Sequence, residues 1–296
     1  MARVADTRRN AGTRGSNSTA TTGVGRHTGT AALSQVDLDQ TAEFMGAYAD
    51  RPAAPVAVVI AAYNEEASVG NVVTAVPREL CGLQTEVIVV VDGARDATAE
   101  AARMAGALVC DVPVNRGQGA ALRLAYHLAR ERGATFIMST DADGQYASGD
   151  MQRVLAPVVA GDADFVSGSR RLGSTTSRDI ARNTGVVVFA GLISVLTHHK
   201  VTDPSCGLRA MKADVTASVV LDQPQYQASE LLIGAAMAGY RLLEVPIAMQ
   251  ARHSGTTKKG GNLLYGYRFA SVVVGTWWRE SRVPRAPDRS TNTNRS

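Results

Sequence analysis

The chain of 296 residues carries 31 Lys and Arg against 27 Asp and Glu, a formal net charge of +4, and 45% of its residues are hydrophobic. This composition supports one large domain or two small ones, and the lack of a basic stripe with interleaved aromatic residues argues against a nucleic-acid partner. Three widely spaced cysteines, Cys81, Cys110 and Cys206, argue against a disulfide framework or structural zinc and for a cytosolic setting.

The first 50 residues are rich in Thr, Ser, Gly, Ala and Arg and show almost no apolar periodicity. They predict a disordered N-terminal tail over residues 1–50, with a short helix over 36–48 as an open alternative. The tail lacks the apolar core of a secretory signal, while its likeness to an organellar transit peptide stays open. No run reaches the roughly twenty apolar residues that span a bilayer, so we do not expect an integral membrane protein. The cysteine usage and the missing secretory signal predict a cytoplasmic protein.

From residue 56 onward, short apolar runs alternate with amphipathic ones. Strands are expected at 56–60, 86–91, 107–111, 135–140 and 165–169, and helices at 68–76, 96–105, 118–132 and 151–160. Short strands rich in Val and Ile that alternate with helices predict an α/β fold with a mostly parallel central sheet and helices on both faces.

After residue 169 the alternation loosens. We expect a helix at 180–197, a strand at 208–212, a helix at 229–238 and a strand at 242–247. These elements extend the same domain, which we place at residues 51–260. An amphipathic helix over 261–282 and a disordered basic tail over 283–296 complete the predicted organisation.

Polar segments follow four of the predicted strands, at 63–66, 92–93, 115–117 and 141–145. In mostly parallel sheets ligands bind beyond the carboxyl ends of the strands, so these segments are expected to meet at one rim. Asp141 and Asp143 stand one residue apart directly after an apolar strand. Mg²⁺ or Mn²⁺ prefers such oxygen ligands and shares them with phosphates, which suggests a site for a nucleotide sugar. A solvated surface turn is the alternative.

These motifs, taken together, resemble the inverting family-2 glycosyltransferases of GT-A fold, and most closely the dolichyl- or polyprenyl-phosphate sugar synthases. The first five matching segments are Ala-Ala-Tyr-Asn-Glu-Glu at 61–66, Val-Asp-Gly-Ala-Arg-Asp-Ala-Thr at 91–98, Asn-Arg-Gly-Gln-Gly-Ala-Ala-Leu-Arg at 115–123, Asp-Ala-Asp-Gly-Gln at 141–145 and Gly-Ser-Arg at 168–170. Three more are Asp-Pro-Ser-Cys-Gly-Leu-Arg at 203–209, Glu-Val-Pro-Ile at 244–247 and Arg-His-Ser-Gly-Thr-Thr-Lys at 252–258. The resemblance covers residues 56–259.

The sequence departs from the family at four places. Ala61 stands where the family usually has Pro, and Val91 leaves Asp92 as the single acid of a usual acidic pair. Ala94 replaces Ser, and Tyr146 begins the dipeptide that replaces His-Pro. These changes bear on the base and the sugar more than on the fold.

The resemblance implies a set of donor-side residues. Asp141, Asp143 and Gln145 are expected to hold Mg²⁺ or Mn²⁺ against the donor diphosphate. The metal stabilises the negative charge of the diphosphate as it leaves. The other donor-side residues are expected to bind the nucleoside or a phosphate of the donor. They are Tyr63, Asn64, Glu65, Asp92, Asn115, Gly117 and Arg182. Helix capping is an equal alternative for Glu65 and the favoured role for Glu66.

Basic residues are implied around the acceptor phosphate or the donor diphosphate, namely Arg170, Arg252 and Lys258. Arg170 ends a buried strand and needs an anionic partner, because burying an unpaired guanidinium is costly. Glu230 or Asp203 becomes a candidate general base if the acceptor is a sugar hydroxyl. A phosphate monoester needs no base, because it is largely a dianion at neutral pH.

The expected function is metal-dependent, inverting transfer of a sugar from a UDP- or GDP-linked donor to a polyprenyl (dolichyl-type) phosphate. The alternative is a soluble hydroxyl acceptor, as in natural-product or polysaccharide biosynthesis. A nucleotidyltransferase is disfavoured, because residues 61–66 are not a glycine-rich phosphate loop with an arginine. A non-catalytic binding module is the remaining hypothesis.

The C-terminal helix offers a second link to lipid. Its residues Tyr265, Phe269, Val272, Val273, Trp277 and Trp278 fall roughly on one flank, and an arginine-rich tail follows. Trp and Tyr favour the headgroup boundary and arginines favour anionic lipid, so we expect an in-plane helix and a peripheral position on the inner membrane face. A helix docked on the catalytic domain is the open alternative.

Overall fold

The computed structural model describes residues 33–175, 180–223, 225–250 and 262–282. The strands are β1 (Val56–Ala62), β2 (Glu79–Leu80), β3 (Leu83–Asp92), β4 (Leu108–Val112), β5 (Phe136–Asp141), β6 (Phe165–Thr175), β7 (Arg209–Lys212) and β8 (Leu242–Met249). The helices are α1 (Gln35–Ala47), α2 (Val69–Ala75), α3 (Thr98–Met104), α4 (Gln118–Glu131), α5 (Ser148–Val159), α6 (Ile180–Thr197), α7 (Ala213–Ser218), α8 (Gln227–Met237) and α9 (Asn262–Ser281).

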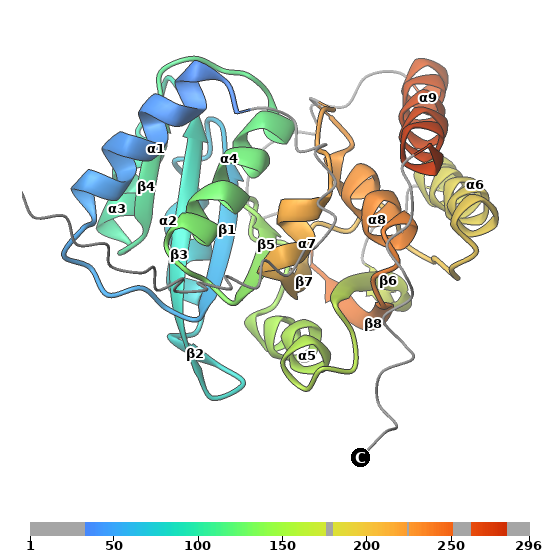
Figure 1. Cartoon of the computed structure of the whole chain (residues 1–296), viewed down its shortest axis with the longest axis horizontal. Coiled ribbons are helices and arrows are strands. Elements are labelled where there is room, and N and C mark those ends of the chain that lie inside the picture. The colour runs from blue at the N-terminus through green and yellow to red at the C-terminus, as the bar shows by residue number, and fades with distance from the viewer. Residues whose placement is uncertain (1–32, 176–179, 224, 251–261, 283–296) are drawn as a thin grey trace, which may run out of the picture.

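Within the described residues the strands form one eight-stranded sheet with a mostly parallel core (Figure 1). Its order is β4-β3-β1-β5-β7-β6-β8, with the short β2 folded back on β3. β1 runs parallel to β3 and β5, whereas β7 runs antiparallel to both of its neighbours. The predicted α/β class and mostly parallel sheet are confirmed. The hairpin strand β2 and the short helix α7 were not expected.

The central strand β1 is buried on both faces, as a strand rich in Val and Ile inside a parallel sheet should be. Val56 and Val58 pack in the cluster that includes α5, while Ala57 and Val59 pack in the cluster that includes α4. Successive side chains of a strand point to opposite faces, so one short run serves two hydrophobic layers. This packing fixes the strand register and with it the position of the loop that follows Ala62.

The N-terminal helix α1 lies along the β4 edge of the sheet, beside α4 (Figure 1). Phe44 is buried in the main core cluster, and the Tyr48 hydroxyl accepts the backbone N–H of Val109 at 2.9 Å. The disordered tail predicted for residues 1–50 is therefore wrong over Gln35–Ala47, where the alternative short helix is correct. Residues 1–32 lie outside the described residues.

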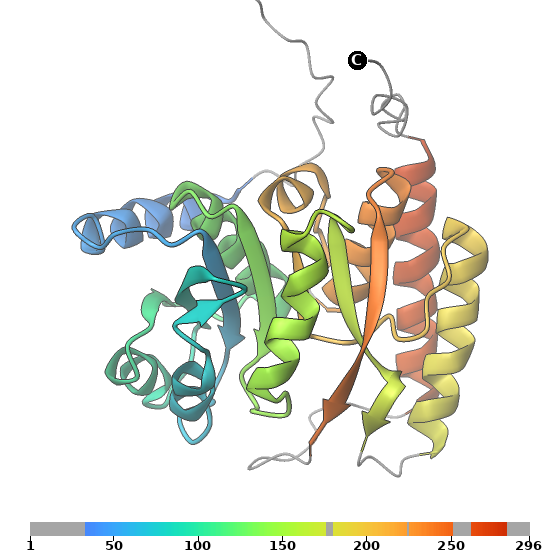
Figure 2. The ribbon, with the colours of Figure 1, turned by 90° about the horizontal axis from the view of Figure 1, so that it is seen from below.

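At the opposite end of the sheet, α6 and α9 lie side by side and α8 packs against both (Figure 2). The rings of Phe189 in α6 and Phe269 in α9 are 4.3 Å apart between centroids. Among the described helices, none combines the length and hydropathy needed to cross a bilayer.

Candidate functional site

The loops after β1 and β3 hold each other through side-chain to backbone hydrogen bonds. The Asn64 side-chain oxygen accepts the Arg95 N–H at 2.9 Å, and Glu66 accepts the Ala97 N–H at 2.9 Å. The Glu65 N–H donates to the Thr98 hydroxyl at 2.8 Å, and the Glu65 carboxylate accepts from Ser68 at 2.9 Å. Glu66 therefore caps the entry to α3 rather than the helix that directly follows it in sequence.

Asp92 joins the loop after β3 to the loop after β4. One of its carboxylate oxygens accepts the backbone N–H groups of Arg116 at 2.8 Å and Gly117 at 2.7 Å. The Asn115 side chain donates to the Asp92 carbonyl at 3.0 Å. Asp92 is only 2% exposed, so it holds the loop after β4 in place from beneath the surface. Val91, at the family's second acidic position, is buried in the core.

Asp141 lies at the end of β5, between a tyrosine and a glycine. The Tyr146 hydroxyl donates to the Asp141 carboxylate at 3.2 Å and accepts the Gly207 N–H at 2.9 Å. Burial, together with Cys206 and Asp141, raises the pKa of Tyr146 well above its ordinary value, so the hydroxyl stays protonated as a donor. A Cβ atom on Gly207 would lie 2.5 Å from the Asp141 carboxylate oxygens. The orientation of Asp141 is thus fixed from two sides.

The acidic motif also pairs with the end of β8. The Gln145 side-chain amide donates to the Gln250 carbonyl at 3.0 Å, and the Gln250 N–H donates to the Gln145 carbonyl at 2.9 Å. Tyr146 forms a β-bridge with Met249. The Asp143 carboxylate accepts the Gln145 N–H at 3.3 Å. The end of β8 therefore lies beside Gln145 and Tyr146, which follow Asp141 and Asp143 in the acidic motif.

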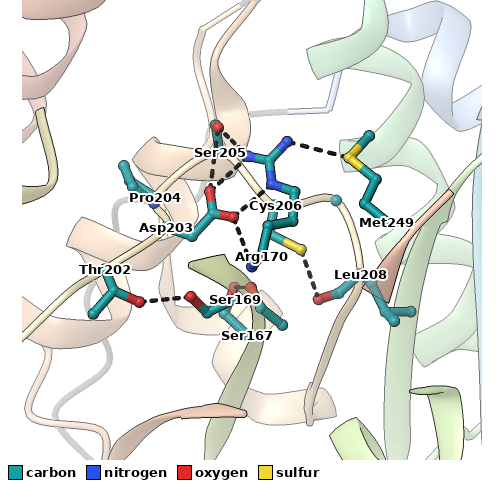
Figure 3. A network of polar contacts seen from close by, with 12 residues as sticks. Ser167, Ser169, Arg170, Thr202, Asp203, Pro204, Ser205, Cys206, Leu208 and Met249 are labelled. Atoms are coloured by element: carbon teal, nitrogen blue, oxygen red, sulfur yellow. Dashed lines mark hydrogen bonds and ion pairs between the residues drawn. The ribbon is translucent and has the colours of Figure 1, made fainter. Parts of the chain in front are cut away.

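Arg170 has its anionic partner within the protein. Its guanidinium makes two 2.6 Å contacts to the carboxylate of Asp203, and its backbone N–H donates to the same group at 3.1 Å (Figure 3). The Asp203 side chain is fully buried. Burial opposes its ionisation, yet the contacts with Arg170 outweigh burial and hold the pKa of Asp203 below its ordinary value. The expected anion for Arg170 is thus supplied by a carboxylate of the chain.

Glu244 holds this pair in place from β8. Its carboxylate accepts the backbone N–H groups of Thr202 at 2.7 Å and Asp203 at 2.9 Å. Glu244 was present in a matched sequence motif but had no assigned role, and neither Gly207 nor Tyr146 was singled out for the site. The contacts of Glu244 with Asp203 and of Gly207 with Tyr146 span 41 and 61 positions of the chain, so local sequence patterns carry no signal for them.

Glu230 lies in a different cluster. Its fully buried carboxylate accepts the N–H groups of Asp222 at 3.1 Å and Gln223 at 3.0 Å, and Arg279 of α9 donates to it at 3.0 Å. Burial raises the pKa of Glu230. With all these contacts inside the protein, Glu230 ties α9 to α8, and the geometry gives no support to its predicted role as a general base.

The side-chain oxygens of the acidic motif supply only part of the coordination shell of a hard divalent cation. Asp141 and Asp143 are both half-buried and offer carboxylate oxygens, the ligands that Mg²⁺ and Mn²⁺ prefer. The described parts of the chain contain no group of three or more His, Cys, Asp or Glu side chains that could hold a metal. A cation here would need further oxygens, as a diphosphate provides.

Several residues that were predicted for the site make none of the contacts described above. Arg252 and Lys258 lie outside the described residues, and so does the side chain of Arg182, whose backbone belongs to α6. Tyr63 is exposed on the loop after β1. The remaining residues that were predicted for the donor side, Asn64 and Glu65 among them, lie at the carboxyl ends of β1, β3, β4 and β5.

Residues 57–219 match the family model described as Glycosyl transferase family 2. A dolichyl-phosphate hexose transferase of Haloferax volcanii is 34% identical over 202 residues, which cover 68% of this chain and 85% of the relative. A polyprenol monophosphomannose synthase of Mycolicibacterium smegmatis is 30% identical over 256 residues, which cover 80% of this chain and 91% of the relative.

The fold also matches solved structures. Glucosyl-3-phosphoglycerate synthase of Mycobacterium tuberculosis, crystallised with Mn²⁺, uridine diphosphate and phosphoglyceric acid, gives a TM-score of 0.58 at 21% identity, with 83% of this chain and 84% of that chain covered. At this identity the likeness bears on the fold alone, and it confirms the predicted GT-A fold.

Proposed function

The chain belongs to glycosyl transferase family 2, and from this membership we propose that it transfers a sugar, with inversion, from a nucleotide-diphosphate sugar to a polyprenyl phosphate. Two relatives that are at least 30% identical to this chain over the aligned residues are named dolichyl-phosphate hexose transferase and polyprenol monophosphomannose synthase. Both are covered over more than four fifths of their own length, which supports carrying over the class of acceptor that their names give.

The donor side of this proposal rests on Asp141 and Asp143. They would hold Mg²⁺ or Mn²⁺ together with the donor diphosphate, and the bound metal would stabilise the charge that develops on the leaving group. Tyr146 and Gly207 fix the orientation of Asp141 before any ligand arrives. The linked loops after β1, β3 and β4 would receive the UDP or GDP part of the donor.

The contacts of the two candidate general bases, Asp203 and Glu230, support a phosphate acceptor. Asp203 and Glu230 are both fully buried, and each is engaged by an arginine and by backbone N–H groups. A hydroxyl acceptor would require a base that reaches its proton, whereas a phosphate monoester attacks as a dianion. This occupation of both carboxylates is the observation that carries the choice of a phosphate acceptor.

A lipid-linked acceptor requires access to a membrane surface, for which α6 and α9 offer exposed apolar side chains. We use the name α6/α9 face for those of them that are exposed by 45 to 73%, which are Val187, Val188, Val195, Tyr267, Val274 and Trp278. The Arg282 guanidinium stacks on the Trp278 ring at 3.3 Å from its centroid. Apolar and aromatic side chains bordered by arginine suit the interface of an anionic bilayer.

This face shares only Trp278 with the flank that the sequence suggested. Phe269 and Val273 are buried against the protein, and Trp277 packs on the same core. The alternative of a helix docked on the catalytic domain is thus the correct description of α9, and lipid contact is proposed for its opposite side and for α6. The side chain of Tyr265 lies outside the described residues.

The test is a transfer assay with UDP- and GDP-linked hexoses and Mn²⁺, in which the acceptors are a polyprenyl phosphate, the matching polyprenol and a soluble sugar. We expect product only with the phosphate, and none with Asp143→Ala, whose half-exposed position contributes little to stability. Asp162→Ala, which removes an exposed acid elsewhere, serves as the control. Transfer to the soluble sugar but not to the lipid phosphate would establish the alternative acceptor class instead.

A further inference from the structure

Helix α1 lies outside the region that matches the family, which begins at residue 57. It nevertheless carries a fully buried carboxylate, Asp37, in its first turn. An acid this deeply buried on a terminal helix is unusual, because a buried charge is costly unless it is paired. Its partners therefore indicate what the helix does.

Asp37 has two partners that belong to different parts of the chain. One carboxylate oxygen accepts from the Ser34 backbone at 2.9 Å and the Ser34 hydroxyl at 2.7 Å, which closes the helix N-terminus as a capping box. The other oxygen accepts from the Arg116 guanidinium at 2.7 Å. Burial opposes ionisation, but these hydrogen bonds from Ser34 and Arg116 outweigh it and hold the pKa of Asp37 below its ordinary value.

Arg116 connects α1 to the donor-side rim. Its side chain is 17% exposed and lies between Asp37 and Asp92, with 3.7 Å from its Nε to the second Asp92 oxygen. Its backbone N–H and that of Gly117 both donate to the first oxygen of the Asp92 carboxylate. Gly93 adds to this fit, because a Cβ atom there would lie 2.2 Å from the Asn115 nitrogen.

We propose that α1 is a brace for the donor loop Asn115–Gly117: Asp37 holds the Arg116 side chain, and Arg116 in turn closes over Asp92. The part of this inference that concerns nucleotide binding rests on the proposed function. Asp37 and Arg116 are positioning residues, which preset the loop so that the donor does not bear the entropic cost of ordering it. Helix α1 packs against β4 and α4, at the other end of the sheet from β6 and β8.

The experiment compares Asp37→Asn with Asp39→Asn in the full chain. The amide introduced by Asp37→Asn retains an oxygen that can accept from Ser34 but loses the charge that Arg116 pairs with, whereas Asp39 is an exposed acid on the same helix. Amide hydrogen exchange is measured at Arg116 and Gly117 without any ligand, and donor and acceptor KM are measured with turnover.

We expect Asp37→Asn to speed exchange at Arg116 and Gly117 by about tenfold or more, and Asp39→Asn to leave it unchanged. Asp37→Asn should raise the donor KM several-fold and leave kcat and the acceptor KM as in the wild type. Unchanged exchange in Asp37→Asn, or equal acceleration in both variants, would overturn the brace. The exchange measurement uses no nucleotide, so it stands even if the proposed function fails.

Discussion

Gly207 leaves no room for a side chain beside Asp141, and this residue-scale fit yields the first prediction. In Gly207→Ala the new methyl group would displace the carboxylate, which is the movable end of a side chain, so the fold should survive. We expect Mn²⁺ affinity in the presence of UDP to fall roughly tenfold or more, as for other residues that orient a ligand. Calorimetric titration measures this Mn²⁺ affinity.

The matched control for Gly207→Ala is Gly149→Ala on α5, where an added Cβ atom meets nothing within 4 Å. Both variants should keep a thermal midpoint close to that of the wild type. If Gly207→Ala binds Mn²⁺ and UDP as tightly as Gly149→Ala does, Asp141 is not held in the manner described here.

Arg170 illustrates how a residue predicted for ligand binding acquires a structural role. Arg170→Ala would leave the Asp203 carboxylate buried without its partner, so we expect the free energy of unfolding to fall by about 3 kcal/mol or more. Arg171→Ala, which removes an exposed neighbouring arginine, should change it by less than about 0.5 kcal/mol. Urea unfolding measures both.

The same pair predicts a pH dependence. The pKa of Asp203 is lowered in the folded state, so its contribution to stability is present above the ordinary value of 3.8 and is lost as the pH falls through the folded pKa. Arg170→Ala should lose less stability than the wild type in this acid window. An equal loss in both proteins would mean that other carboxylates determine the acid sensitivity.

At the scale of elements, α9 is fixed to α8 by Glu230 and Arg279. Glu230→Gln weakens this connection, and we expect a loss of about 1–3 kcal/mol in unfolding free energy. Turnover should stay within about threefold of the wild type, whereas removal of a general base would cost ~10²–10⁴-fold. Steady-state kinetics with the phosphate acceptor decides between these outcomes.

Asp222→Asn is the control for this helix contact. Asp222 also pairs with Arg279, at 3.3 Å, but its side chain is half exposed, so the stability change should be small. A hundredfold loss of turnover in Glu230→Gln, with full activity in Asp222→Asn, would restore the general-base role and the hydroxyl acceptor with it.

At the scale of the whole molecule, α1 lies at one end of the sheet, with the loops after β3 and β4, and α6 and α9 lie at the other end (Figure 1). If the α6/α9 face meets lipid, the protein should float with anionic liposomes at low salt and dissociate as salt is added. Val195→Glu on α6 should abolish flotation, because it places a negative charge on the face.

Met104→Glu on α3 is the matched control for the lipid prediction. Met104 is 80% exposed, comparable with Val195 at 72%, but its helix α3 lies at the other end of the sheet from α6 (Figure 1). If both variants still float with the liposomes, the α6/α9 face does not contact lipid. Truncation before α9 is not a usable test, because Phe269 and Val273 belong to the core.

Local patterns in the sequence predicted most of the helices and strands. Alternating apolar runs predicted the strands from β1 to β6 and the helices between them, apart from the short β2, and the helix expected at 180–197 coincides with α6. Asp141 and Asp143 were also recognisable, because paired carboxylates after an apolar strand violate the pattern of a buried core. The packed N-terminal helix was obscured by its composition: Val36 and Leu38 face solvent, and Phe44 alone is a deeply buried apolar anchor.

The partners of the charged residues were decided only by the tertiary structure. Arg170 pairs with Asp203, Glu230 with Arg279 and Asp37 with Arg116, over separations of 33, 49 and 79 positions. A sequence shows that a buried charge needs a partner, because desolvation is costly, but it does not show which carboxylate the fold brings within about 3 Å. Strand order and helix docking make that choice, and they gave Arg170 and Glu230, two predicted catalytic residues, partners within the protein.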